Sequence, residues 1–450
     1  MDHEHLLTPS NPERPISIFD GKRPPSLDLI EDCVHCGFCL PTCPTYLLWG
    51  EEMDSPRGRI YLMEMGVEGR AEMTPTYVQH FDRCLGCMAC VTACPSGVQY
   101  GSLIEATRPQ IERHYRRTPG DRLFRRLLFT ILPHRNRLRA FALPTLLYQA
   151  SGLRRALRRS GIMERLPPRI RAAESLMPSV SLRALRARVP ERVAARGVRR
   201  RRVGLLLGCV QGVFFPGVNA ATARVLSAEG CEVIIPPGQG CCGALMLHAG
   251  QEDGALDRAR RTIDAFERAG VDSIVINAAG CGSTMKDYAR LLADDPAYVE
   301  RARAFSEKCR DITEILAELE PRAPRLPLPL RVAYHDACHL QHAQGIRDAP
   351  RKVLRSIPQL ELVEIPEAAI CCGSAGIYNL VEPAAATDLG DRKAGHILST
   401  PADLIATGNP GCIMQIRGGL GRAGSRLPVV HTVELVDASI RGVMPRGWTK

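Results

Sequence analysis

The pattern of apolar and polar positions changes character near residue 202. Beyond this point, short apolar runs alternate with amphipathic stretches of helical period. We expect strands at 203–207, 231–235 and 273–278, and helices at 219–229, 255–269 and 284–292. Strands that alternate with helices form a mostly parallel sheet covered by those helices. The pattern therefore predicts an α/β domain at residues 201–320.

The same pattern restarts after a proline-rich polar stretch at residues 321–329, which is typical of a linker. We expect strands at 331–335, 360–365 and 403–407, and helices near 350–356, 384–397 and 414–421. The restart indicates an internal repeat, with a second α/β domain at residues 330–445.

Between residues 119 and 200, arginines alternate with leucine, phenylalanine and isoleucine at helical spacing. Five prolines should divide this region into short helices: Pro133, Pro144, Pro167, Pro168 and Pro178. Basic amphipathic helices can lie on an anionic membrane. They can also connect domains and turn their arginines to solvent or to an acidic subunit, which is the interpretation we favour. We therefore predict an Arg-rich helical connector.

The positive charge of the chain is concentrated in this connector. The whole chain of 450 residues has a formal net charge of +11. Residues 121–202 hold 22 arginines and four acidic residues, so that the remainder of the chain carries −7; the acidic residues are Asp121, Glu164, Glu174 and Glu191. This local distribution argues against a uniformly basic nucleic-acid-binding protein.

The sequence also predicts where in the cell the protein is located. It contains no apolar run long enough to span a bilayer and no recognisable secretory leader. Residues 1–30 are polar and proline-rich, and we expect them to form a loosely ordered lead-in. The protein is therefore expected in the cytoplasm or peripherally on the inner membrane.

Eighteen cysteines supply the candidate chemistry, and eight of them form two equal runs. Both runs have the spacing C-x2-C-x2-C-x3-C-P; they are Cys33, Cys36, Cys39, Cys43 and Pro44, and Cys84, Cys87, Cys90, Cys94 and Pro95. This spacing is typical of a ferredoxin with two [4Fe–4S] clusters, in which the fourth cysteine of each run serves the other cluster. A pair of zinc sites, the alternative, would usually have ligands in close pairs.

We therefore assign the eight cysteines to two [4Fe–4S] clusters in a ferredoxin-type domain at residues 31–118. Cys33, Cys36, Cys39 and Cys94 form one ligand set, and Cys84, Cys87, Cys90 and Cys43 form the other. Arg57 and Arg59 lie between the two runs and could offset the negative charge of the clusters. Pro56 beside them also marks an ordinary helix start.

Eight further cysteines recur in matched register in the two α/β domains. The first domain has Cys209, Cys241, Cys242 and Cys281, and the second has Cys338, Cys371, Cys372 and Cys412. Each position follows a predicted strand, and ligands collect at the carboxyl ends of parallel strands. We expect the four thiols of each domain to converge on a metal site, in preference to eight buried structural cysteines.

The remaining candidates are less specific. Cys231 and Cys309 have no repeat partner, and we interpret them as ordinary core or surface residues. His335, His339 and His342 lie near Cys338. Hydrogen bonding to cluster sulfur, a proton relay and a purely structural role all stay open for these histidines.

Together these features resemble the iron–sulfur subunit of glycolate oxidase. The resemblance rests on both ferredoxin runs, on Pro56-Arg57-Gly58-Arg59, on residues 94–101 and on the duplicated Cys-Cys-Gly triplets, and it extends from about residue 27 to residue 443. We predict a multidomain α+β and α/β fold: a helical ferredoxin-like domain, the connector and two tandem α/β domains. The resemblance implies that an FAD-containing partner subunit oxidises glycolate or another 2-hydroxy acid, and that this chain passes the electrons to a quinone or another acceptor.

Related complexes supply the alternatives. They are D-lactate dehydrogenase, anaerobic glycerol-3-phosphate dehydrogenase and heterodisulfide reductase-like disulfide or quinone reductases. No G-x-G-x-x-G sequence follows a predicted strand, which agrees with a flavin site on another chain. In heterodisulfide reductase, five cysteines hold a noncubane cluster, and here Ala278 and Asn409 replace the fifth. An ordinary cubane, a cluster with a noncysteine ligand and a quinone-interacting site all stay open.

Overall fold

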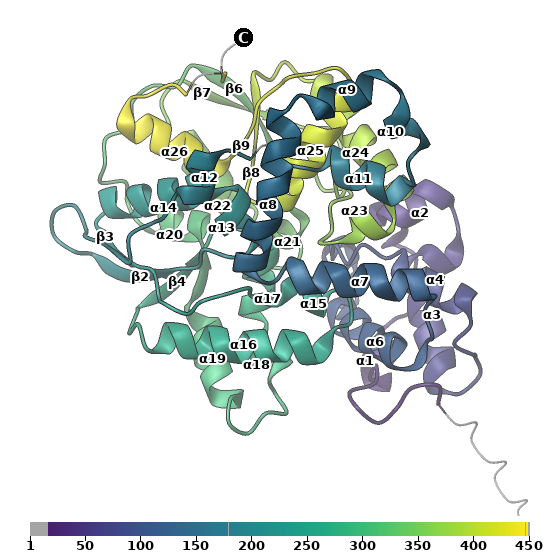
Figure 1. Ribbon diagram of the computed structural model, residues 1–450. Coiled ribbons are helices and arrows are strands. Elements are labelled where there is room, and N and C mark those ends of the chain that lie inside the picture. The colour runs from purple at the N-terminus through teal and green to yellow at the C-terminus, as the bar shows by residue number, and fades with distance from the viewer. Residues whose placement is uncertain (1–16, 179, 446, 449–450) are drawn as a thin grey trace, which may run out of the picture.

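The computed structural model describes residues 17–178, 180–445 and 447–448 (Figure 1). It contains a helical N-terminal part, a group of connecting helices and two mainly parallel sheets, which confirms the predicted multidomain fold class. Residues 1–16 of the predicted lead-in lie outside the described residues. The domain boundaries given above stay predictions.

The N-terminal part consists of short helices around two cysteine loops. Its elements are α1 (Leu27–Glu31), η1 (Leu40–Thr42), α2 (Pro44–Trp49), η2 (Glu52–Asp54), α3 (Pro56–Val67), α4 (Pro75–Asp82), α5 (Ala89–Ala93) and α6 (Tyr100–His114). Pro44 begins α2 directly after Cys43, because its fixed φ suits a first helical position that needs no N–H donor. Met63, Phe81 and Leu103 are fully buried in the core of this part.

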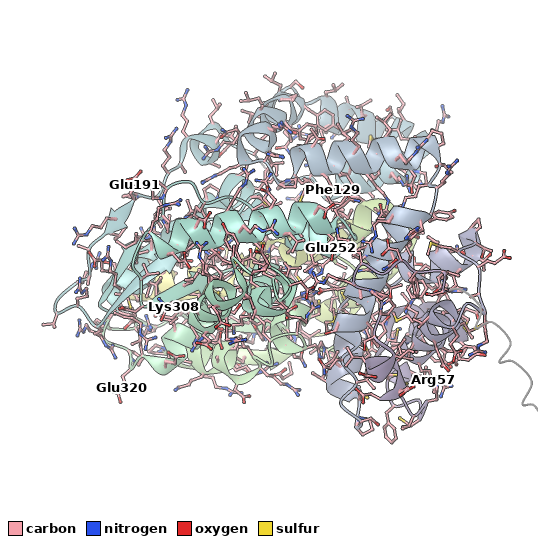
Figure 2. All side chains as sticks on the ribbon, turned by 90° about the horizontal axis from the view of Figure 1, so that it is seen from below. Arg57, Phe129, Glu191, Glu252, Lys308 and Glu320 are labelled. Atoms are coloured by element: carbon pink, nitrogen blue, oxygen red, sulfur yellow. The ribbon has the colours of Figure 1, made fainter. Side chains whose placement is uncertain are left out.

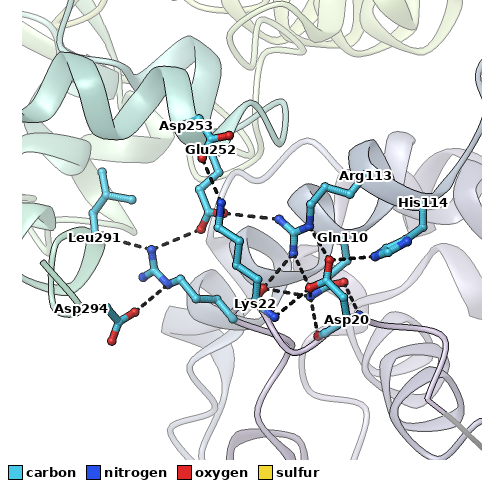
Figure 3. A network of polar contacts seen from close by, with 10 residues as sticks. Asp20, Lys22, Gln110, Arg113, His114, Glu252, Asp253, Leu291 and Asp294 are labelled. Carbon is cyan, nitrogen blue, oxygen red and sulfur yellow. Dashed lines mark hydrogen bonds and ion pairs between the residues drawn. The ribbon is translucent and has the colours of Figure 1, made fainter.

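The described part of the lead-in is held in place, contrary to the expected loose order (Figure 3). Asp20 accepts hydrogen bonds from Arg113 near the end of α6. Lys22 forms an ion pair with Glu252, which belongs to the first α/β half of the molecule and is 8 % exposed. These partners lie far along the chain, so the local polar, proline-rich composition does not reveal them.

Among the described residues of the connector, 119–178 and 180–200, the structure forms six helices. They are α7 (Pro119–Ile131), α8 (Arg135–Ala150), α9 (Leu153–Arg159), α10 (Ile162–Arg165), α11 (Pro168–Ser175) and α12 (Leu182–Arg186). Pro144 was predicted to break a helix, but it lies inside α8. Proline removes one intrahelical hydrogen bond, and Leu138 and Ala142 keep α8 packed against Val213. Among the described residues, no helix combines the length and apolarity needed to cross a bilayer.

The first α/β half is built on a five-stranded sheet of order β1-β3-β2-β4-β5. Its strands are β1 (Arg192–Val193), β2 (Arg201–Leu205), β3 (Cys231–Ile234), β4 (Ser273–Ile276) and β5 (Cys309–Asp311), all parallel except β1. Its helices are α13 (Val210–Phe214), α14 (Pro216–Ala228), α15 (Ala244–Leu247), α16 (Glu252–Glu267), α17 (Ala279–Lys286), α18 (Tyr288–Leu291), α19 (Val299–Lys308) and α20 (Ile312–Glu318). The helix predicted at 284–292 is thus divided at Asp287.

The second α/β half repeats this arrangement with the strand order β7-β6-β8-β9, all parallel. Its strands are β6 (Leu330–His335), β7 (Leu360–Glu364), β8 (Leu404–Thr407) and β9 (Val429–His431). Its helices are α21 (Cys338–Gln341), α22 (Asp348–Arg355), α23 (Tyr378–Val381), α24 (Pro383–Leu398), α25 (Pro410–Arg422) and α26 (Thr432–Arg441). The three-residue strands β5 and β9 were too short to be predicted from the apolar pattern.

The two halves face each other across their strand ends. The backbone N–H of Ala279 donates to the carbonyl of Gly408 at 3.1 Å. The matching position in the second half is Pro410, which has no N–H, and His431 Nε2 bonds to the carbonyl of Asn277 instead, at 2.9 Å. The segments that follow β4 and β8, which carry Cys281 and Cys412, are therefore in contact at this interface.

Candidate iron–sulfur sites

Four N-terminal cysteines surround a hollow at the ferredoxin end of the molecule. They are Cys33, Cys36, Cys39 and Cys94, and Cys90 of the other set also reaches this hollow. Cys36 is exposed, and the other three are half-buried. Val34 and Phe38 beside them are 69 % and 66 % exposed. A docking protein could therefore approach this set directly.

Arg57 lines the same hollow. Its guanidinium donates to the carboxylate of Glu52 at 2.6 Å and to the carbonyl of His35 at 3.0 Å. Because Arg57 lines this hollow, the positive charge of its guanidinium lies beside the first cysteine set. Figure 2 shows Arg57 at one end of the molecule and Glu320 at the opposite end.

The second N-terminal set is buried. Its members, Cys43, Cys84, Cys87 and Cys90, are each at most 9 % exposed. The N–H of Gly86 donates to the sulfur of Cys84 at 3.3 Å, and the hydroxyl of Tyr100 lies 3.4 Å from the same sulfur. Hydrogen bonds of this kind stabilise a thiolate or a cluster sulfur.

Arg59 supplies the charge for this buried set. It is 1 % exposed, donates to the carbonyl of His80 at 2.5 Å and forms an ion pair with Asp54 at 3.4 Å. Burial alone would raise the pKa of the Cys84 thiol, but Arg59 and Arg108 stabilise the thiolate, so that its pKa falls below the ordinary value. The two arginines singled out in the sequence therefore lie beside different cysteine sets.

In the first α/β half, four cysteines from three strand ends come together. Cys209 follows β2, Cys241 and Cys242 follow β3, and Cys281 lies in the first turn of α17 after β4. The Sγ atoms of Cys209 and Cys241 are 3.6 Å apart. All eighteen cysteines of the chain are free thiols.

The second half repeats this arrangement with Cys338, Cys371, Cys372 and Cys412. The Sγ atoms of Cys338 and Cys371 are 4.0 Å apart. The glycine of each Cys-Cys-Gly triplet has a positive φ, +87° at Gly243 and +86° at Gly373. A β-carbon at Gly373 would lie 2.7 Å from the carbonyl oxygen of Ala386, so only glycine fits this turn.

The three histidines near Cys338 have different surroundings. His335 is 1 % exposed, and one of its ring nitrogens lies within 4.8 Å of the sulfurs of Cys372 and Cys412. Burial and the nearby Lys393 hold its pKa well below the ordinary value, so the ring is neutral. A neutral imidazole can bind a metal ion or donate to sulfur.

The other two histidines join the second half to the ferredoxin loop. A ring nitrogen of His339 lies 3.0 Å from the carbonyl oxygen of Gly86. His342 bonds to the hydroxyl of Thr92 at 2.6 Å. In the same region Cys87 packs in one buried cluster with Cys371. The buried ferredoxin set therefore adjoins the Cys-Cys-Gly set of the second half.

The cysteines of both halves line one cavity, and this sharing between the halves was not predicted from the sequence. All eight Cys-Cys-Gly cysteines contribute to this cavity of about 400 Å³, and apolar side chains of α7 and α8 form much of its wall. The covering role of these helices depends on tertiary packing and had no signal in the sequence. Lys393 was also missed, because a lysine in an amphipathic helix is normally exposed; here it is 2 % exposed and donates to the carbonyl of Glu367.

The donor sets fit iron–sulfur clusters. Each of the four sets consists of thiols, the soft ligands that such clusters require. Protein N–H groups and arginines lie beside several of them. In the first half, hydrogen bonds from neighbouring thiols and the charge of Arg258 keep the pKa of Cys241 well below its ordinary value, which favours a thiolate ready to bind metal.

Family comparisons cover three parts of the chain. Residues 29–98 match the family described as "4Fe-4S dicluster domain". Residues 120–177 match "Glycolate oxidase iron-sulfur subunit, linker region". Residues 203–286 and 332–417 each match "Cysteine-rich domain". The matches agree with the ferredoxin loops, the connector helices and the two α/β halves described above.

Individual relatives resemble nearly the whole chain. The "Probable glycolate oxidase iron-sulfur subunit" of Bacillus subtilis is 40 % identical over 90 % of this chain and 93 % of its own length. The "Glycolate oxidase iron-sulfur subunit" of Escherichia coli is 37 % identical over 92 % of this chain and 94 % of its own length. The "Lactate utilization protein A" of Exiguobacterium sp. is 30 % identical over 53 % of this chain and 98 % of its own length. The chain therefore belongs to the family of glycolate oxidase iron–sulfur subunits.

Proposed function

We propose that this chain is the iron–sulfur electron-transfer subunit of a glycolate or other 2-hydroxy acid oxidase complex. The observation that supports this most is the continuous series of cysteine sets. An accessible set is followed by a buried set, and the buried set adjoins a Cys-Cys-Gly set. Such a series suits the transfer of single electrons through the protein interior.

In this proposal, Cys33, Cys36, Cys39 and Cys94 hold one [4Fe–4S] cluster, and Cys43, Cys84, Cys87 and Cys90 hold the other. Bound clusters supply one-electron carriers with potentials between about −700 and +450 mV. The chain tunes these potentials with its own groups. Arg57 and the exposed surroundings act on the first set, whereas Arg59, Tyr100 and burial act on the second.

The Cys-Cys-Gly sets hold further iron–sulfur clusters in the same proposal. Their ligands are Cys209, Cys241, Cys242 and Cys281 in the first half, and Cys338, Cys371, Cys372 and Cys412 in the second. His335 lies within 4.8 Å of two of the second-half sulfurs and offers a nitrogen ligand or a hydrogen bond. Ala278 in the first half offers no polar side chain at the replaced fifth cysteine.

An FAD-containing partner subunit oxidises the hydroxy acid in this proposal. The accessible surface around Cys36, with Val34 and Phe38 beside it, is the docking site we assign to this partner. Exposed apolar side chains next to a redox centre bring a partner close enough for electron transfer. The substrate is then bound by the partner and not by this chain.

Anaerobic purification tests the central proposal. We expect about eight irons or more per chain and an electron paramagnetic resonance signal after reduction, since two cubanes alone contain eight irons. Cys87→Ser should lower the iron content, whereas Cys231→Ser should not. Both cysteines are buried, at 8 % and 0 % exposed, but Cys231 belongs to none of the four sets. A preparation that contains only zinc would reject the proposal.

D-lactate oxidation is the alternative that a specific observation favours, because a relative named for lactate utilisation matches about half of this chain. The intact complex should reduce a dye with a panel of 2-hydroxy acids. Glycolate turnover well above lactate turnover supports the first proposal, and the reverse order supports the alternative. Turnover of a disulfide by the chain alone would instead support a heterodisulfide reductase-like activity.

Peripheral attachment to the inner membrane is a further part of the proposal. Leu123, Leu143 and Leu147 of the connector are 69 %, 51 % and 69 % exposed, and arginines are interspersed among them. Exposed apolar side chains interspersed with arginines suit an anionic bilayer. The chain should float with anionic liposomes, and the double substitution Leu123→Glu and Leu147→Glu should abolish flotation. Equal flotation of the variant would exclude this surface.

A further inference from the structure

A basic hollow lies between the connector and the first α/β half. Five arginines line it: Arg135, Arg137 and Arg139 come from α8, and Arg258 and Arg261 come from α16. The volume of the hollow is about 520 Å³. Among the described residues that line it, there is no aspartate or glutamate. A hollow with five cations and no carboxylate attracts an anionic ligand, because a bound anion offsets the repulsion between the cations.

Two of these arginines are not fully paired within the protein. The Nε atoms of Arg135 and Arg139 are buried and have no hydrogen-bond partner. The guanidinium of Arg135 lies over Gly212, where an added β-carbon would be 3.3 Å from Nε. Burial and the charges of Arg139 and Arg188 lower the pKa of Arg135, so the neighbouring cations act against its own charge. Buried polar atoms are nearly always paired, and the protein itself leaves these two guanidinium groups incompletely satisfied.

Among the described residues, the other three arginines have one carboxylate partner between them. Arg261 forms an ion pair with Asp257 at 3.0 Å. Arg137 donates to a backbone carbonyl at 3.1 Å, and Arg258 lies 3.1 Å from a ring nitrogen of His134. A [4Fe–4S] cluster held by the four thiolates of the first half would add a net charge of about −2 nearby. The hollow keeps a positive charge when this cluster and Asp257 are both counted.

The first turn of α8 forms part of the same hollow. His134 and Asn136 line it, and no side chain caps the N-terminus of this 16-residue helix. The first N–H groups of a helix have no intrahelical partner, and the helix dipole places partial positive charge there. Phosphate groups bind at such helix ends because several N–H donors point toward them. The helix end therefore adds to the attraction that the arginines exert on an anion.

We propose that the basic hollow binds a soluble phosphorylated small molecule with at least two negative charges. Arg135, Arg139 and the first turn of α8 hold its phosphate groups, since a guanidinium donates two parallel hydrogen bonds to phosphate oxygens. The volume of the hollow falls within the range of about 300–1,000 Å³ found for small-molecule sites. Among the described residues that line it, no large apolar side chain is exposed, so a lipid tail has no apolar surface to follow.

The bound molecule lies beside the first Cys-Cys-Gly set. Cys241 lines both the basic hollow and the cavity shared by the eight cysteines. Negative charge at this place disfavours the addition of an electron to a cluster in the first half, because like charges repel. The ligand thus lowers the reduction potential of the first-half centre and regulates electron flow. This consequence rests on the proposed electron-transfer function, whereas the binding itself does not.

Calorimetric titration of the full chain with its clusters tests the site. Inorganic pyrophosphate, added without magnesium at low ionic strength, is the probe. We expect saturable binding to one site, and citrate, which carries carboxylates instead of phosphates, should bind more weakly. Arg139→Gln should raise the dissociation constant for pyrophosphate at least about tenfold, because it removes a charged hydrogen-bonding group. Tighter binding of citrate would overturn the assignment to phosphate.

Arg126→Gln is the matched control. Arg126 is an exposed arginine of α7 and does not line the hollow. Its dissociation constant should equal that of the unchanged chain, and Arg139→Lys, which keeps the charge, should bind more tightly than Arg139→Gln. The melting temperature without pyrophosphate should be the same in all four proteins. Equal binding by Arg126→Gln and Arg139→Gln, or no saturable heat, overturns the site. Displacement of pyrophosphate by phosphatidylglycerol vesicles would assign the site to a lipid headgroup and overturn the soluble ligand.

Redox titration with and without saturating pyrophosphate tests the regulatory consequence. The electron paramagnetic resonance signal that is lost in Cys242→Ser should move to a lower potential when pyrophosphate binds. The same concentration of pyrophosphate should move it less in Arg139→Gln. An unchanged potential despite binding would overturn the regulation. Absence of iron would overturn the electron-transfer proposal instead, and the calorimetric result would still decide the binding site, so the failures are distinguishable.

Discussion

The two α/β halves share a backbone arrangement, yet their cysteines have different surroundings. In the second half, the side-chain N–H of Asn409 donates to the sulfur of Cys412 at 3.5 Å, and His335 lies beside the same sulfur. The corresponding residues of the first half are Ala278 and Leu206, which cannot donate. Duplication has thus kept the thiols and changed the hydrogen bonds around them.

The positive charges near the two Cys-Cys-Gly sets also come from different parts of the chain. The second half has its own buried cation, Lys393, on α24, whereas the matching residue on α16 is Thr262. The first half relies on Arg258 and on Arg135 of the connector, which lines a basic hollow with Cys241. Hydrogen bonds and charge set cluster potentials. The comparison teaches that two copies of one ligand set can serve as different redox centres.

Two separate variants, each of which removes one cysteine from one α/β half, should change electron transfer most. Cys372→Ser should abolish electron flow from the ferredoxin part to the α/β halves, because the second set adjoins Cys87. Cys242→Ser should remove iron from the first half only and leave reduction of the second half intact. Freeze-quench electron paramagnetic resonance after reduction measures both. Identical spectra for the two variants would contradict the proposed order.

The glycines of the two triplets should differ in their effect on stability. Gly373→Ala should lower the free energy of unfolding by about 2–4 kcal/mol, because it adds a close contact to the strain of a positive φ. Gly243→Ala should cost about 1–2 kcal/mol, since its β-carbon would lie 3.1 Å from the carbonyl oxygen of Ala255 and not 2.7 Å. Thermal unfolding under anaerobic conditions compares them. Equal costs would show that the two turns relax equally well.

The helix caps of the two halves should respond to pH in opposite directions. Asp311 caps α20 and His431 caps α26, each with a glutamate three residues later. Burial raises the pKa of Asp311 to about 6, above its ordinary 3.8, so its stability contribution is present near pH 4 and is lost as the pH rises through 6. Burial lowers the pKa of His431 from 6.5 to about 4, so its contribution is lost as the pH falls through this range.

Each of these contributions is about 3 kcal/mol or less. Asp311→Asn should therefore remove the loss of stability between pH 4 and 6, and His431→Asn should remove the loss on acidification. Asparagine keeps a capping side chain in both variants. The melting temperature of each variant and of the unchanged chain is measured from pH 4 to 7. The slope of their difference against pH gives the contribution of each cap. Slopes of the same sign would contradict the assignment.

Exchange of the residues at the replaced fifth cysteine should have the smallest effect. Asn409→Ala should lower the potential of the second-half centre by about 20–60 mV, the equivalent of about 0.5–1.5 kcal/mol for one hydrogen bond. The reciprocal Ala278→Asn should raise the first-half potential by a similar amount if its amide reaches Cys281. Redox titration followed by electron paramagnetic resonance measures both shifts. A higher reduction potential of the second-half centre in the Asn409→Ala variant would show that Asn409 does not stabilise the reduced centre.

The sequence by itself determined the features that depend on short spacings. Each ferredoxin run and the alternation of strands and helices are local patterns, and the matched register of the Cys-Cys-Gly cysteines is a repeat of spacings that can be read directly from the sequence. They were sufficient to predict the fold class and the four cysteine sets. The physical reason is that backbone period and the geometry of a ligand loop are set by neighbouring residues.

Only the tertiary structure decided which parts meet. The contact of Cys87 with the second half, the single cavity shared by both halves and the burial of Lys393 all join residues far apart in the chain. Pro144 inside α8 and the ordered segment around Asp20 are further cases. Each depends on the free energy of packing or ion pairing between distant segments, which outweighs local propensity and leaves no trace in local sequence patterns.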